Sequence, residues 1–248
     1  MPNGKTTGFF RRLHRPAKKL GSADPPANLS AMHCLVTAGP TYEPLDQVRR
    51  LTNFSTGRLG TELANFLTDR GHRVTLLLGQ QATWGGGRRA SRVESFTTGR
   101  DLSERLRALA GEPVDAVFHA AAVGDFAFGK VWLQTPLGER REVSAAKFPT
   151  RAGTLLAELR PTPKIIAHLR GWFPTAQLVG WKFEVEGDRA GALRRAEGQL
   201  AETATDACVV NGPAYGDGFG LLTRGQTPVH RPDSPGLFAA LADFLAPK

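Results

Sequence analysis

Short apolar runs alternate with amphipathic segments along the chain from residue 33 onward. The runs at residues 33–37, 74–78 and 114–120 are mainly apolar, which is typical of strands buried on both faces of a parallel sheet. Between them, apolar residues recur at helical spacing over residues 57–70 and 102–109. The alternation predicts an α/β fold with a Rossmann-like, doubly wound, mostly parallel sheet.

The same alternation resumes in the last third of the chain. Residues 178–183 and 207–210 are expected to be strands, and the helix between them is expected to begin at Asp188. A hairpin around Gly225 and a final helix containing Leu237 and Leu241 complete the predicted domain.

Residues 127–160 interrupt this pattern. They carry polar and basic positions and a turn at Pro136-Leu137-Gly138, with too little continuous helix or strand for a core element. A segment of this length inside a compact domain is typically a lid, a binding loop or an assembly arm. We therefore expect one domain over residues 32–248 with a flexible flap or dimerisation insertion at about 127–160.

The net charge of +9 is concentrated at the N-terminus. Residues 1–31 contain more than half of the excess, with six basic residues against Asp24 alone. Their composition predicts a disordered basic extension, either a solvated tail or a tether to an anionic surface. Because the rest of the chain is only weakly basic, we expect no nucleic-acid partner.

The hydrophobic content of 41% and the charged content of 22% are typical of a globular protein and exclude wholesale disorder. No apolar run approaches the roughly 20 residues of a membrane-spanning helix. We expect a cytoplasmic protein that does not bind a membrane. Cys34 and Cys208 each stand alone in an apolar run, which predicts reduced core residues.

Ligands of open α/β sheets bind beyond the carboxyl ends of the strands, so the residues there are candidates for chemistry. The turn at residues 37–41 contains small residues, including Gly39, that let the backbone approach a ligand, but it lacks the G-x-G-x-x-G spacing. Gly79-Gln80 follows the second strand, with no acidic residue for a ribose hydroxyl, which argues against NAD.

Two further strand or helix ends carry polar groups. Ser55, Thr56, Gly57 and Arg58 open the first helix, where free N–H groups favour a phosphate; an ordinary helix cap with an exposed arginine is the alternative. Asp125 follows the strand at 114–120 and is either a ligand of a metal or sugar hydroxyl, or a turn residue.

Hydride transfer of the short-chain dehydrogenase type needs a Tyr-x-x-x-Lys pair. The only tyrosines, Tyr42 and Tyr215, are followed four residues later by Asp46 and Phe219. An NAD(P)-dependent Rossmann oxidoreductase therefore remains an alternative without its usual proton donor.

Five segments, taken in order, resemble the phosphopantothenate–cysteine ligase (phosphopantothenoylcysteine synthetase) family, the synthetase domain of the DNA/pantothenate metabolism flavoprotein. They are VTAGPTYEPLDQVR (36–49), LTNFSTGRLG (51–60), AAAVGDF (120–126), GWKFE (180–184) and VN (210–211).

The resemblance implies a nucleotide-dependent ligase of coenzyme A biosynthesis that forms a carbon–nitrogen bond. ATP or CTP would activate the carboxylate of 4′-phosphopantothenate as an acyl-nucleotide with Mg²⁺, and the amine of L-cysteine would then attack it. Charge neutralisation and positioning should dominate such a reaction. A catalytically degenerate nucleotide-binding homologue is a second alternative.

The resemblance also implies roles for individual residues. Asn53 and Arg49 would hold phosphopantothenate and stabilise the intermediate, and Lys147 in the flap would supply a catalytic cation, with Lys130 and Arg151 as substitutes. Family members are dimers that share the flap region, which implies a homodimer. The implied nucleotide-binding residues are Gly39, Ser55, Thr56, Gly57, Arg58, Ala121, Asp125, Phe126 and Lys182, with Asp125 also the metal ligand.

Overall fold

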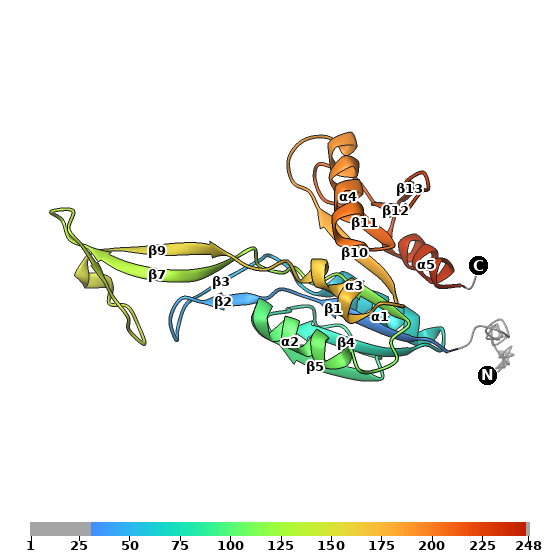
Figure 1. Cartoon of the computed structure of the whole chain (residues 1–248), viewed down its shortest axis with the longest axis horizontal. Coiled ribbons are helices and arrows are strands. Elements are labelled where there is room, and N and C mark those ends of the chain that lie inside the picture. Colours follow the sequence, from blue (N-terminus) through green and yellow to red (C-terminus); the bar gives the residue numbers. More distant parts are fainter. Residues whose placement is uncertain (1–30, 247–248) are drawn as a thin grey trace, which may run out of the picture.

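The computed structural model describes residues 31–246. Residues 1–30, which are all of the predicted basic extension except Ala31, lie outside this range. The last two residues of the chain also lie outside it. Within it, the chain forms a layered α/β domain from which a long β-arm projects (Figure 1).

The domain is built on an eight-stranded sheet in the order β13-β12-β11-β10-β6-β1-β4-β5. Its parallel strands are β1 (His33–Ala38), β4 (Arg73–Gly79), β5 (Arg92–Phe96), β6 (Ala116–His119), β10 (Gln177–Phe183) and β11 (Ala207–Asn211). β12 (Phe219–Thr223) and β13 (Val229–Arg231) add an antiparallel edge that contains the predicted hairpin. Counting only the parallel strands, the order is that of the Rossmann fold. The predicted fold class is confirmed.

Helices cover both faces of this sheet. They are α1 (Arg58–Asp69), α2 (Gly99–Leu109), α3 (Leu169–Trp172), α4 (Arg189–Thr203) and α5 (Ser234–Leu245), with 3₁₀ turns η1 (Thr150–Ala152) and η2 (Ile165–His168). Among residues 31–246, none of the helices has the length and apolar character needed to cross a membrane.

Alternation along the strands divides the core between the two faces. Cys34 and Val36 of β1 pack into the cluster that contains α1 and α5 residues, whereas Leu35 packs into the cluster of α2 and α3. Cys208 of β11 packs against α4. Both cysteines are free and buried, as expected, and burial raises their pKa to about 12, which makes them unreactive core residues.

The arm is a three-stranded antiparallel sheet in the order β8-β7-β9. Its strands are β7 (Phe126–Gln134), β8 (Arg140–Glu142) and β9 (Thr154–Pro161). The expectation that residues 127–160 hold too little continuous strand was wrong. Among residues 126–151 and 153–161, only Val131 and Phe148 are buried hydrophobic residues. The strands are stabilised mainly by pairing with each other, and such strands leave a weak apolar pattern in the sequence.

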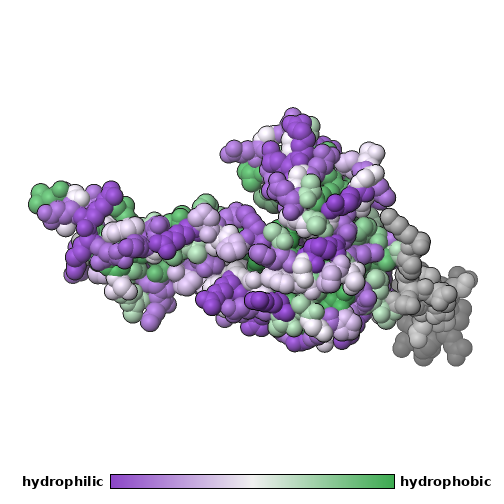
Figure 2. Space-filling model, viewed as in Figure 1, coloured by the Kyte–Doolittle hydropathy of each residue, from purple (hydrophilic) through white to green (hydrophobic). Residues whose placement is uncertain are grey.

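The arm surface mixes hydrophilic residues with exposed hydrophobic ones, including at its far end (Figure 2). Leu137, in the β7–β8 turn, is 89% exposed. Beside the base of the arm lies a short hairpin that sequence reasoning did not predict, made of β2 (Tyr42–Pro44) and β3 (Arg50–Thr52).

Candidate nucleotide-binding crevice

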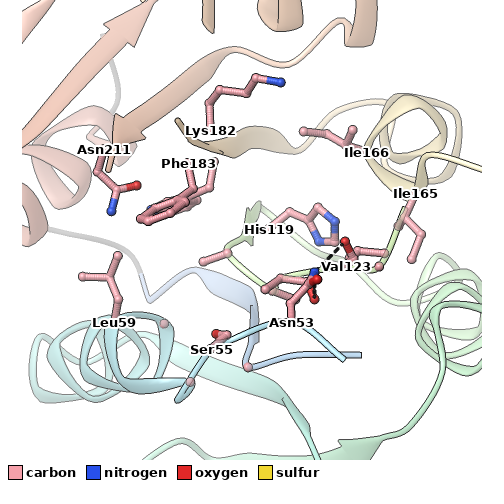
Figure 3. Close-up of a pocket in the computed structure, with 18 of the residues that line it drawn as sticks. Asn53, Ser55, Leu59, His119, Val123, Ile165, Ile166, Lys182, Phe183 and Asn211 are labelled. Carbon is pink, nitrogen blue, oxygen red and sulfur yellow. Dashed lines mark hydrogen bonds between the residues drawn. The ribbon is translucent and has the colours of Figure 1, made fainter. Parts of the chain in front are cut away.

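A cavity of about 840 Å³ lies at the carboxyl ends of β1, β6 and β10, where the strand order of the sheet reverses. Its walls come from several segments (Figure 3). They are Gly39 after β1, residues 53–60 at the start of α1, residues 119–125 from the end of β6, residues 162–166 leading into η2, and residues 181–183 of β10. Elements far apart in the sequence therefore converge on one crevice.

The N-terminus of α1 offers free backbone N–H groups to this cavity. Gly57 is the N-cap residue, with a φ of 76°, and has no side chain to cap the helix. Thr56 Oγ1 accepts a hydrogen bond from the Arg58 N–H (3.3 Å), which leaves the next N–H groups of the first turn for a ligand. A Cβ at either Gly39 or Gly57 would lie 2.9 Å from Ala82 Cβ, and both glycines have positive φ. Only glycine fits the turn at both positions, and the helix end is left open for an anion.

Asn53 lies opposite this helix end and is anchored to the backbone after β6. Its Nδ2 group donates hydrogen bonds to the carbonyl oxygens of Ala122 (3.3 Å) and Val123 (3.1 Å). Because both amide hydrogens are directed to main-chain acceptors, Oδ1 is the amide atom that remains for a ligand.

Asp125 also lines the cavity, where its carboxylate forms an ion pair with Lys164. The described residues contain no group of three or more His, Cys, Asp or Glu side chains placed to hold a metal ion. A single carboxylate does not form a resident metal site. It does suit Mg²⁺ that arrives with nucleotide phosphates, because Mg²⁺ usually keeps several waters and takes one or two carboxylates.

His119, the last residue of β6, is a cavity residue that sequence reasoning missed. Its imidazole is only 6% exposed, and Nδ1 lies 3.0 Å from the Thr37 hydroxyl of β1. Burial lowers the pKa of His119 to about 4, so the ring is neutral at physiological pH. The available signal was its position at a strand end, but the residue was interpreted as part of the strand.

A family model described as the DNA/pantothenate metabolism flavoprotein C-terminal domain matches residues 29–231 of this chain. The chain belongs to the DNA/pantothenate metabolism flavoprotein C-terminal domain family. The resemblance found from the sequence segments is thereby confirmed.

Curated relatives of this family member are longer proteins. The chain is 32% identical over 212 residues to the coenzyme A biosynthesis bifunctional protein CoaBC of Thermococcus kodakarensis, covering 84% of this chain and 47% of the relative. It is 30% identical over 209 residues to the Bacillus subtilis protein of the same name, with coverage of 84% and 47%. The chain spans about half the length of these relatives.

Solved structures support the fold of the family domain. The DNA/pantothenate metabolism flavoprotein from Streptococcus pneumoniae has a TM-score of 0.74 at 23% identity, covering 87% of this chain and 98% of that one. A Cab2 mutant in complex with phosphopantothenate-cysteine has a TM-score of 0.63 at 17% identity, with coverage of 86% and 87%.

Within this family domain, the crevice brings together most of the predicted site residues. They are Gly39, Asn53, Ser55, Thr56, Gly57, Arg58, Ala121, Asp125 and Lys182. Phe126 is not among the lining residues; it begins β7 and is 44% exposed. Sequence reasoning also missed Lys164, the ion-pair partner of Asp125.

Arg49 and Lys147 lie outside the cavity, in two loops that are hydrogen-bonded to each other. Arg49 donates to Asp46 Oδ2 (3.0 Å) and to the Phe148 carbonyl oxygen (3.2 Å), and the Phe148 N–H donates to Asp46 Oδ2 (3.2 Å). Burial alone would raise the pKa of Asp46, but three backbone N–H donors and the Arg49 guanidinium lower it below its ordinary value. Asp46 thus holds the loop that carries Lys147 against the turn that carries Arg49.

Proposed function

We propose that the chain is a phosphopantothenate–cysteine ligase that acts in the cytoplasm. The observation that carries this proposal is that an open helix N-terminus and an anchored asparagine line one crevice in a member of this family. The names of its CoaBC relatives support a role in coenzyme A biosynthesis. An NAD(P)-dependent oxidoreductase is not favoured by any of these comparisons.

In the first proposed step, the α1 N-terminus and Arg58 bind the triphosphate of ATP or CTP, and a carboxylate oxygen of 4′-phosphopantothenate attacks the α-phosphorus. The new O–P bond forms as the bond to the pyrophosphate group breaks. Asn53 orients the pantothenate end through Oδ1. Asp125 would hold Mg²⁺ together with the nucleotide phosphates, and the metal would neutralise phosphate charge.

In the second step, the amine of L-cysteine attacks the activated carbonyl carbon. A C–N bond forms, the amine loses a proton, and the nucleoside monophosphate leaves. Positioning by Asn53 and the crevice walls supplies most of the rate enhancement, because the activated carbonyl needs little acid–base assistance.

In this proposal, Lys147 of the arm is the catalytic cation, and it acts in the crevice of a second copy of the chain. Lys147 is exposed and does not line its own cavity, and the arm buries few side chains by itself. A homodimer in which Lys147 reaches the crevice of the partner would satisfy both features.

The direct test is a reaction of the purified protein with 4′-phosphopantothenate, L-cysteine, Mg²⁺ and either ATP or CTP. We expect pyrophosphate release and formation of 4′-phosphopantothenoylcysteine, and the preferred nucleotide identifies the co-substrate. If neither nucleotide supports turnover while both bind, the chain is a degenerate homologue and the proposal fails.

Two variants test the shared site. Lys147→Gln should suppress acyl-nucleotide formation. Normal rates in this variant would instead assign the role to Lys130, which pairs with Glu142, or to Arg151. Mixing Lys147→Gln with Asn53→Ala subunits should restore about a quarter of wild-type activity if sites are shared across a two-fold dimer. No recovery after subunit exchange would place Lys147 at the crevice of its own chain or remove it from the mechanism.

A further inference from the structure

His119 and Thr37 form a buried pair at the floor of the crevice. They are register partners on the neighbouring strands β6 and β1, and Thr37 is fully buried. Thr37 Oγ1 accepts a hydrogen bond from the Ala121 N–H (3.1 Å) and lies 3.0 Å from His119 Nδ1. The pair therefore connects the strand ends that define the switch point.

This arrangement determines which nitrogen of His119 carries the proton. A buried hydroxyl hydrogen requires an acceptor, and His119 Nδ1 is the only one that residues 31–246 provide for Thr37. Nδ1 therefore accepts, and the hydrogen of the neutral ring is on Nε2. Protonation of Nδ1 would break this bond and charge a buried ring, which agrees with the depressed pKa of His119.

The Nε2–H group is the free donor of this imidazole. It has no hydrogen-bond partner among the described residues. It is also not one of the side-chain atoms of these residues that are both shut off from solvent and without a partner, so it opens to the cavity. Figure 3 shows the ring among the crevice residues, with Asn53 and Val123 near one side and Lys182 above.

The charges around the cavity favour an anionic acceptor for this donor. The two carboxylates that line it are already paired, Glu62 with Arg58 and Asp125 with Lys164. Lys182 reaches its nearest carboxylate, Glu184, at a longer distance of 3.6 Å. The α1 N-terminus adds positive potential. A neutral N–H in this field is complementary to phosphate or carboxylate oxygens.

We propose that His119 is a substrate-binding residue whose Nε2–H donates a hydrogen bond to an anionic oxygen in the crevice, and that Thr37 is the positioning residue that fixes its tautomer. The identity of the ligands rests on the proposed ligase function. The oxygen belongs either to the nucleoside triphosphate or to 4′-phosphopantothenate.

Two amide substitutions of His119 distinguish the roles of its two ring nitrogens. His119→Gln places an amide N–H near the position of Nε2, whereas His119→Asn places its amide near Nδ1 and leaves the cavity without the donor. Binding of 4′-phosphopantothenate and of non-hydrolysable ATP and CTP analogues is measured separately by calorimetry. We expect His119→Asn to weaken one ligand class about ten- to hundredfold, as for a lost hydrogen bond to a charged group, and His119→Gln to bind within about threefold of wild type.

The affected ligand identifies the source of the oxygen. Unchanged affinity of His119→Asn for both ligand classes overturns the proposal. A wild-type protein that binds these ligands but performs no ligation contradicts only the proposed function. A wild-type protein that binds neither contradicts both.

The tautomer is tested on the wild-type protein by long-range ¹H–¹⁵N NMR of the imidazole, assigned by difference from His119→Gln. We expect a protonated Nε2 and an acceptor Nδ1, with the Nε2 signal shifting when the ligand binds. Thr37→Val should produce a mixture of tautomers, while Thr37→Ser, which keeps the hydroxyl, should not. A wild-type ring protonated at Nδ1 overturns the proposal even if the variants fail to fold.

Discussion

The crevice and the arm are stabilised in different ways. The crevice lies on strand ends whose residues are buried on both faces, and Phe118, one residue before His119, is fully buried. The arm exposes most of its side chains and depends on strand pairing and on the Asp46 contacts with the β2–β3 turn. The crevice is therefore built on the buried core of the domain, whereas the arm presents most of its side chains to solvent.

The largest expected effect of this contrast is on stability. Phe118→Ala should lower the free energy of unfolding by about 3–5 kcal/mol, because it opens a cavity in a core that cannot fully relax. Leu159→Ala, in β9 and 48% exposed, should lower it by about 1 kcal/mol or less. Urea denaturation measures both, and similar losses for the two variants would contradict the comparison.

A second effect is the pH dependence of stability. The histidines of the described chain all lie in the domain, and the arm contains none. The pKa of His119 is about 4 in the folded state against about 6.5 when unfolded, so the unfolded state binds the extra proton at intermediate pH. Stability should therefore fall as pH decreases from 6.5 to 4, by about 3 kcal/mol at most from this residue.

His119→Gln provides the control for this pH effect. The pKa of His72 is also lowered by burial and by Arg70, so the wild-type slope contains both contributions. The variant should lose the His119 part alone and show a shallower decline in its urea midpoint. An unchanged slope would show that His119 is already protonated near its ordinary pKa.

A more local effect is expected for Asp46→Ala. The substitution removes the acceptor of Arg49 and of the Phe148 N–H, so the segment that carries Lys147 keeps only its two main-chain carbonyl contacts with the β2–β3 turn. Hydrogen exchange at residues 146–148 should accelerate, while exchange in β1 and β6 stays at wild-type rates. Acceleration in the central strands as well would mean that the arm and the sheet open together.

The smallest effect is expected at the end of the arm. Leu137→Ser should change the free energy of unfolding by less than about 0.5 kcal/mol, because the side chain is already exposed. Calorimetry at several protein concentrations measures this. A larger, concentration-dependent loss would show that Leu137 is buried against another molecule in solution.

The sequence predicted the parts of the fold in which local pattern and burial agree. The apolar runs at 33–37 and 74–78 became β1 and β4, and Asp188 caps α4 by accepting from the Gly191 N–H. The arm strands were missed because residues such as Gly129 and Lys130 interrupt their pattern at a register shift. The three-residue strands of the β2–β3 hairpin are too short to show a period.

Prediction of the site had a different limit. Residues 55–58 were predicted because helix-start chemistry is local, but His119 and Lys164 depend on partners that are distant in the chain. Thr37 is 82 residues from His119, and Asp125 is 39 residues from Lys164. No local pattern carries that information. The roles of Arg49 and Lys147 stay predictions, because both residues lie outside the cavity.

The arm is inserted in the connection between β6 and β10, which are hydrogen-bonded neighbours in the sheet. The entropy lost in closing such a connection rises only with the logarithm of its length, so a twofold change costs about 0.6 kcal/mol. Insertions and deletions there are nearly neutral for folding. Over evolutionary time, the arm can therefore change in length and sequence much faster than the crevice, and length variation between related chains should be concentrated in this connection.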